Sequence, residues 1–247
     1  DTPLHGFLPF KHIDHLLHPD AAIAIAASKD GEEITKTLWK GAIAWVPWQR
    51  PGFDLGLKLR EALDKNPGIR GIMLGGHGLF TWGDTSYDCY LNSLEVIETA
   101  SAFLAENYGK KRPVFGGEKI KSLPPEQRKS QAAQLAPLLR GLASSASRMV
   151  GTFTDKEVVL EFSNSQDLQL LAPMGTSCPD HFLRTKISPL VLDIPAATDL
   201  SDLSGLRTQL EAAFQSYRER YTAYYEQHKH PNSPAMRDPN PVVIIWP

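Results

Sequence analysis

Short apolar runs, each bounded by polar residues or by Gly and Pro, constrain the fold of this chain more than any other feature. Runs of this length with such boundaries are typical of buried β-strands. Because they are separated by segments with helical spacing, they predict an α/β fold. The runs are AAIAIAAS (21–28), AIAWVPW (42–48) and RGIMLGG (70–76).

Helices are expected between and after these runs. Residues 53–65 place apolar side chains at helical spacing, and the sequence NPG then ends the helix. Residues 32–40 are polar enough for a short helix or an exposed connection. Asp84 or Thr85, after a predicted turn, is a suitable N-cap for a long helix through about Asn107.

The character of the sequence changes near residue 112, where Pro, Gly and charged residues mark a linker. Beyond it we expect helices over 125–142 and 202–228, strands over 147–153 and 156–163, and a Pro-rich tether over 230–241. The final residues, VVIIWP, look like the first strand of a further domain. We therefore divide the chain into an N-terminal domain (1–112), a C-terminal α+β extension with its tether (113–241) and the start of a further domain (242–247).

Composition excludes several classes of partner. The formal charge is −2, from 26 basic and 28 acidic residues without a basic block, so a nucleic-acid partner is not expected. No apolar run approaches the roughly 20 residues of a membrane helix, and the start of the chain lacks the features of a signal peptide. Two cysteines give no disulfide framework. We expect a cytoplasmic protein with no membrane partner.

Histidines cluster before the first apolar run, in FKHIDHLLHPD (10–20), and another, His77, follows the run RGIMLGG. Loops from adjacent strands commonly meet at one edge of a sheet, so His77 could meet the first cluster there. Zinc sites need several such imidazoles at one point. The flanking glycines would let the backbone approach a crowded centre. The alternative is a set of surface-loop histidines, because histidine pairs at these spacings are not specific.

Three segments, LHGFLPFKHIDH, HPDAAIAIAAS and GGHGLFTWGDT, resemble the class II aldolase/adducin family, and the resemblance extends over nearly the whole chain. The most similar branch is that of L-rhamnulose-1-phosphate aldolases fused to a short-chain alcohol dehydrogenase. The resemblance implies an α/β/α sandwich around a central, mostly antiparallel sheet. It also implies a homo-oligomer, because sites in this family lie at subunit interfaces.

The family holds a divalent metal, usually zinc, with a His-x-His pair and a later His-Gly histidine. The resemblance therefore places ligands at His15, His18 and His77. The sequence HLLH departs from the pattern, because two intervening residues put His15 and His18 on opposite faces of a strand. A bulge at Leu16 or Leu17 would restore convergence, and otherwise His12 could replace one member.

The activity that the resemblance implies is retro-aldol cleavage of a phosphorylated deoxyketose, giving dihydroxyacetone phosphate and L-lactaldehyde. The metal acts as a Lewis acid, and a carboxylate moves the proton of the hydroxyl at the breaking bond. The position matching that carboxylate is Asp1, which is one methylene shorter than the family's glutamate. A frayed terminus is the alternative interpretation of Asp1.

The family also places a phosphate-binding loop upstream of this position, and the fused branch continues into a dinucleotide-binding domain. Because neither has a counterpart within residues 1–247, we expect the chain to be an internal piece of a longer bifunctional protein or a natural remnant of one. No G-x-G-x-x-G sequence is present, and NAD binding is not predicted for this chain. A non-catalytic, adducin-like module is the alternative function.

Overall fold

The computed structural model describes residues 2–17, 21–109, 112–145, 147–195, 198, 200 and 203–247. The chain forms two compact units. The first holds the chain up to Arg112 together with Thr176–Leu183, and the second holds Pro113–Gly175 and Arg184–Pro247. No helix among the described residues is long and apolar enough to cross a membrane.

A four-stranded sheet with the order β1-β4-β3-β2 forms the centre of the first unit. Its central strands β3 and β4 are antiparallel and joined by a tight turn, β1 adds antiparallel to β4, and β2 adds parallel to β3. The expected mostly antiparallel central sheet is confirmed. The strands are β1 (His12–Leu16), β2 (Ile43–Val46), β3 (Gly71–Leu74) and β4 (Gly78–Gly83).

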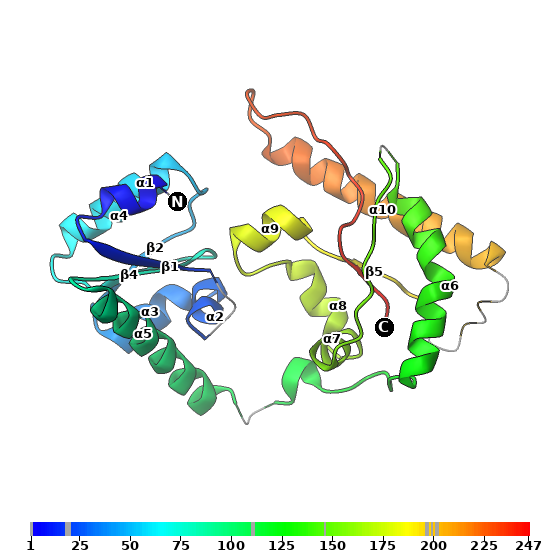
Figure 1. Cartoon of the computed structure of the whole chain (residues 1–247), viewed down its shortest axis with the longest axis horizontal. Helices are drawn as coiled ribbons and strands as arrows, with labels where there is room; N and C mark the ends of the chain where they lie inside the picture. Colours follow the sequence, from blue (N-terminus) through cyan, green and yellow to red (C-terminus); the bar gives the residue numbers. More distant parts are fainter. Residues whose placement is uncertain are drawn as a thin grey trace. The chain divides into compact units, whose positions relative to one another are not determined.

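Helices cover both faces of this sheet (Figure 1). Helices α1 (Thr2–Phe7) and α4 (Phe53–Lys65) bury Leu4, Leu55 and Leu59 against one face. On the other face lie α2 (Ala21–Ala27), α3 (Gly31–Trp39) and α5 (Ser86–Asn107), with a separate apolar cluster beneath them. The predicted α/β/α sandwich is confirmed, with one hydrophobic core on each side of the sheet.

The prediction of a core strand over residues 21–28 is wrong, because Ala21–Ala27 is helix α2. Alanine has the highest helix propensity, and five of the seven residues of α2 are Ala. The buried side chains Ala22, Ile23, Ile25 and Ala26 fall on one helical face. A short apolar run cannot be assigned by periodicity alone, and here the alanine content should have decided the assignment.

The sequence analysis also missed β4, because its Trp82–Gly83 end was interpreted as a turn before the long helix. The strand is buried along Gly78–Trp82 and therefore shows no alternation of polar and apolar residues. The cap is as predicted: the side chain of Thr85 accepts a hydrogen bond from the backbone N–H of Asp88 at 3.1 Å.

The second unit is mainly helical, and its apolar core lies between α6 (Pro125–Ala143), α10 (Ser204–His228) and a two-stranded parallel sheet. Both long helices match the predicted ones. The strands predicted over 147–153 and 156–163 are wrong: the first segment has no regular structure, and the second forms α7. The other elements of this unit are η1 (Val114–Gly116), α7 (Glu157–Ser163), α8 (Leu168–Leu171), η2 (Ala172–Met174), β5 (Leu190–Val191) and β6 (Ile244–Ile245), whereas most of α9 (Pro179–Thr185) belongs to the first unit.

Candidate metal centre

His15 and His77 meet at one end of the sheet in the first unit. His15 lies on the edge strand β1, directly opposite Phe80 of β4. His77 lies in the turn between β3 and β4, where Leu74 pairs with Gly78. Because the turn that carries His77 leads into the strand that pairs with β1, the sheet topology alone brings the two imidazoles together.

The glycines beside His77 make this close approach possible. Gly76 has a φ of +62°, in the left-handed region that glycine adopts without strain. At Gly78, a Cβ atom would collide with the carbonyl oxygen of Leu16, so only glycine lets β1 pass this close. The turn is anchored by hydrogen bonds from Gly76 N–H to the Ala26 oxygen (2.8 Å) and from His77 N–H to the Leu74 oxygen (3.1 Å).

The centroids of the His15 and His77 rings are 5.2 Å apart. His15 also stacks on Phe80, with ring centroids 3.9 Å apart and an interplanar angle of 17°. Phe80 is fully buried and belongs to the core beneath α1 and α4. The pair of imidazoles therefore rests on a rigid apolar base.

Burial keeps both imidazoles neutral. It lowers the pKa of His77 to about 4. The pKa of His15 is lowered to about 3, mainly by burial and further by the charges that His77 and His5 would carry when protonated. A neutral imidazole has a free lone pair that can bind a metal cation. Near neutral pH neither group needs to lose a proton first.

These two residues fit a divalent metal such as zinc. Two imidazoles that bind one tetrahedral ion at a Zn–N distance of about 2.1 Å have centroids about 5.2 Å apart. The Nδ1 atom of His77 is buried and has no hydrogen-bond partner among the described residues. A buried polar atom without a partner is costly unless something binds it, and a cation at this nitrogen would satisfy it.

The other two predicted site residues, His18 and Asp1, lie outside the described part of the chain. The predicted bulge at Leu16 or Leu17 concerns the direction of His18 and so falls partly outside the described residues, while β1 itself ends at Leu16. Within the described residues, no group of three His, Cys, Asp or Glu side chains is placed to hold an ion. His12 precedes His15 by three positions on a strand, and so lies on the opposite face.

His5, for which the sequence predicted no role, also lies at this centre. Its ring lies 6.4 Å from that of His15 and 5.7 Å from that of Phe80, edge-on in both cases. It comes from α1, which packs over this face of the sheet. The only sequence signal for it was its place in the family-like segment LHGFLPFKHIDH.

A hydrogen-bonded network holds β1 from the opposite face of the sheet. Ser93 of α5 donates a hydrogen bond of 2.8 Å to Asp14 Oδ2, and its Oγ lies 2.7 Å from Thr81 Oγ1. Burial, and then the nearby charge of Asp14, raises the pKa of Cys89 to about 11. The thiol is therefore not a reactive group. The network joins β1, β4 and α5, and fixes the strand that carries His15.

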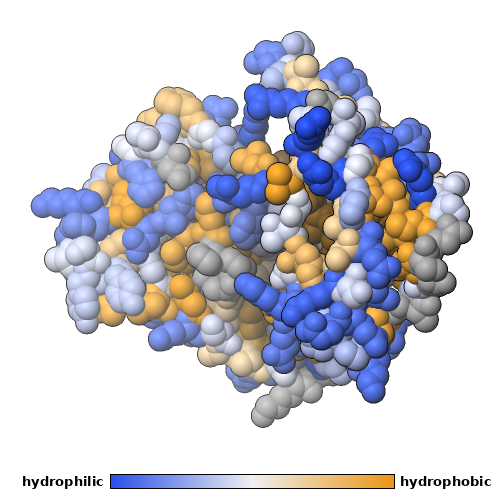
Figure 2. Space-filling view, turned by 45° about the vertical axis from the view of Figure 1, so that its right-hand side comes forward, coloured by the Kyte–Doolittle hydropathy of each residue, from blue (hydrophilic) through white to orange (hydrophobic). Residues whose placement is uncertain are grey.

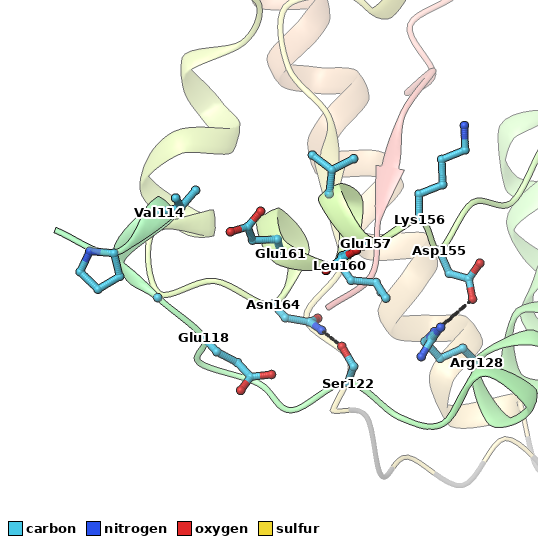
Figure 3. A pocket seen from close by; sticks show the side chains of 13 residues that line it. Val114, Glu118, Ser122, Arg128, Asp155, Lys156, Glu157, Leu160, Glu161 and Asn164 are labelled. Carbon is cyan, nitrogen blue, oxygen red and sulfur yellow. Dashed lines mark hydrogen bonds and ion pairs between the residues drawn. The ribbon is translucent and has the colours of Figure 1, made fainter. Parts of the chain in front are cut away.

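The second unit contains a cavity of about 940 Å³ between the η1 region, the start of α6, and α7 (Figure 3). An ion pair in its wall joins Arg128 and Asp155 at 2.9 Å, and Asn164 donates a hydrogen bond of 2.7 Å to Ser122. None of the predicted site residues lines this cavity. Its most buried polar side chains already have protein partners, in contrast to His77.

Two protein-family models match this chain. The model of the class II aldolase and adducin N-terminal domain matches residues 1–104. The model of the second domain of class II aldolases matches residues 130–247. The two matches follow one another along the chain and together span most of it.

One curated relative is the "uncharacterized oxidoreductase YuxG" of Bacillus subtilis, 33% identical over 246 residues. The match covers 99% of this chain but only 35% of the relative. Among solved structures, the N-terminal class II aldolase domain of a conserved protein from Thermoplasma acidophilum is 32% identical, with a TM-score of 0.36, over 42% of this chain and 46% of that one. An aldolase II superfamily protein from Pseudomonas syringae is 20% identical, with a TM-score of 0.30, over 49% and 47%.

Proposed function

Because the chain belongs to the class II aldolase/adducin family, we propose that it is the metal-binding part of an enzyme that cleaves a phosphorylated deoxyketose by a retro-aldol reaction. Family membership supports a lyase-type role that depends on a divalent metal. The specific proposal is cleavage of L-rhamnulose 1-phosphate to dihydroxyacetone phosphate and L-lactaldehyde, in the cytoplasm, with zinc as the metal.

The observation that carries this proposal is the pair of neutral imidazoles of His77, which is buried, and His15, which is half-buried, with ring centroids 5.2 Å apart. A surface-loop histidine would keep its ordinary pKa and its contact with water. These two are instead placed by strand pairing and by glycines, on an apolar base. We propose His18 as the third ligand.

A bound divalent cation would supply Lewis-acid polarisation of the substrate's carbonyl and hydroxyl oxygens. His15 and His77 would hold it through neutral nitrogens. Phe80 supports the ring of His15 and excludes water beneath it. We propose that Asp1 moves the proton of the hydroxyl at the breaking carbon–carbon bond.

The chain spans 35% of the length of its Bacillus relative, so the activity of a whole protein is part of the proposal. We propose that residues 1–112 form the aldolase-like domain, that 113–241 form its extension and tether, and that 242–247 begin a dehydrogenase domain. The name of the relative, an oxidoreductase, supports such a fusion.

We propose that the protein forms a homo-oligomer. The first half of α5 exposes Tyr87, Tyr90 and Leu91, at positions that share one helical face. Their exposed fractions are 67%, 55% and 43%, which is high for large apolar side chains. Figure 2 shows hydrophobic residues at the surface among hydrophilic ones. Apolar helix faces of this kind commonly pack against another subunit.

A non-catalytic, adducin-like module is the second candidate function. It is favoured by one observation: the sequence HLLH places two residues between His15 and His18, where the metal-binding pattern of the family has one. A protein of this kind would keep the sandwich fold and bind no metal.

The two functions are separated by measuring zinc and cleavage together. We expect the purified chain to retain zinc, and expect the longer protein to release L-lactaldehyde from L-rhamnulose 1-phosphate in a coupled assay. The His77→Ala variant should lose both zinc and cleavage. Zinc without cleavage of any phosphorylated deoxyketose would refute the substrate proposal, and absence of zinc from the wild type would favour the adducin-like module.

A further inference from the structure

His5 occupies a position beside the centre that neither metal binding nor core packing accounts for. It lies on α1, whose Leu4 is buried in the core and fixes the helix against the sheet. The His5 side chain is itself only half-buried. Within the described residues its imidazole makes ring contacts and no hydrogen bond.

The distances indicate that His5 is a neighbour of the proposed metal and not a ligand. His5 and His15 have centroids 6.4 Å apart, compared with 5.2 Å for His15 and His77. Two imidazoles on one tetrahedral ion require about 5.2 Å. The His5 ring therefore lies beyond the distance expected of a second ligand to the same ion as His15. It lies on the same face of the sheet as the stacked rings of His15 and Phe80.

We propose that His5 is a substrate-contacting residue that donates a hydrogen bond to a hydroxyl or carbonyl oxygen of a chelating substrate. The inference rests on the proposed function and extends it to a specific contact. An imidazole N–H in a half-buried position discriminates between ligands that offer an oxygen and ligands that do not. A polyhydroxylated ketose offers such oxygens next to those that a metal would polarise.

The test separates ring packing from hydrogen bonding. His5→Phe keeps an aromatic ring against Phe80 and His15 but removes the N–H group, whereas His5→Asn keeps a donor on a shorter side chain.

Co²⁺ is titrated into each variant of the 247-residue chain and followed by its visible absorption. Acetohydroxamate, a bidentate oxygen chelator, is then titrated into the Co²⁺-loaded protein. The matched control is His12→Phe, because His12 lies on the same strand as His15 but on its opposite face.

We expect His5→Phe to bind Co²⁺ within about threefold of the wild type and to bind acetohydroxamate about 10-fold more weakly. His5→Asn should recover part of the hydroxamate affinity, and His12→Phe should behave as the wild type. The inference is overturned if His5→Phe binds hydroxamate normally, if it loses Co²⁺ as His77→Ala does, or if His12→Phe has the same effect. A wild type that binds no Co²⁺ would refute the proposed function itself, whatever His5 does.

Discussion

The candidate metal centre in the first unit and two polar clusters in the second unit differ in how their buried polar groups are partnered. In the first unit, His77 is buried, His15 is half-buried and both are neutral, and Nδ1 of His77 has no partner among the described residues. In the second unit, Arg128 forms an ion pair with Asp155. Lys186 there donates hydrogen bonds to the backbone oxygens of Asp238 and Asn240.

This difference helps to distinguish polar groups that bind a ligand from polar groups that only hold the fold together. A buried charge whose partners are all protein groups is already satisfied and offers little to a ligand, and removing one of its partners destabilises the fold. A buried polar atom without such a partner lowers stability unless a ligand completes it. By this criterion the centre in the first unit is the better candidate for the functional site, although the second unit contains a cavity of about 940 Å³.

The largest expected effect comes from removing a buried aromatic ring in each unit. Phe80 and Phe214 are both fully buried, one in each unit. Replacing either by Ala should cost about 3–5 kcal/mol of unfolding free energy. Only Phe80→Ala should also weaken metal binding, because only Phe80 stacks on His15.

Urea unfolding followed by tryptophan fluorescence and by circular dichroism measures this pair of variants. Trp39, Trp45, Trp48 and Trp82 lie in the first unit and report mainly on it. If Phe80→Ala does not fold, Phe80→Leu removes the stacking at a smaller cost. Equal loss of metal from the Phe80 and Phe214 variants would contradict the assignment of the site to the first unit.

Raising the pH should destabilise the second unit through Tyr217. Its hydroxyl donates a hydrogen bond of 2.8 Å to the oxygen of Ser188, and burial raises its pKa to about 12. A raised folded-state pKa gives stability that is complete below the unfolded value of about 10 and is lost between pH 10 and 12. The loss should reach at most about 2.7 kcal/mol.

Unfolding measured at pH 8, 10 and 11 checks this expectation. Tyr217→Phe cannot ionise at this position, so its stability should fall less over that range. If wild type and variant show the same dependence on pH, Tyr217 is not the titrating group.

A smaller effect is expected from the ion pair in the cavity wall. The side chains of Arg128 and Asp155 are 18% and 26% exposed, so Arg128→Met leaves a mostly buried carboxylate without its partner. We expect a loss of about 2 kcal/mol, below the 3–5 kcal/mol of a fully buried pair. The double variant Arg128→Met/Asp155→Leu should recover most of it, and zinc content should not change in either. A change in zinc content would contradict the assignment of metal binding to the first unit and of a purely structural role to this ion pair.

Much of the fold follows from the sequence. Helix α4 and the cap of α5 depend on local spacing and on one side chain, and both were predicted. Helix α2 was mistaken for a strand, because a short apolar run has the same pattern in either structure. Strand β4 was missed, because a strand buried on both faces shows no alternation.

The site was predictable only in part. The expectation that His77 meets the first histidine cluster rested on neighbouring strands sharing an edge, and the structure brings His77 together with His15. The place of His5 depends on how α1 packs on the sheet, which no local pattern encodes. The roles of His18 and Asp1 remain predictions from the family resemblance.

Zinc content per chain, measured by mass spectrometry on metal-reconstituted and desalted protein, tests the central claim most directly. The wild type and the control His12→Ala should each retain about one zinc per chain, and His77→Ala should retain almost none. Equal zinc in the wild type and His77→Ala would show that the metal binds elsewhere, and the account of this centre would be wrong.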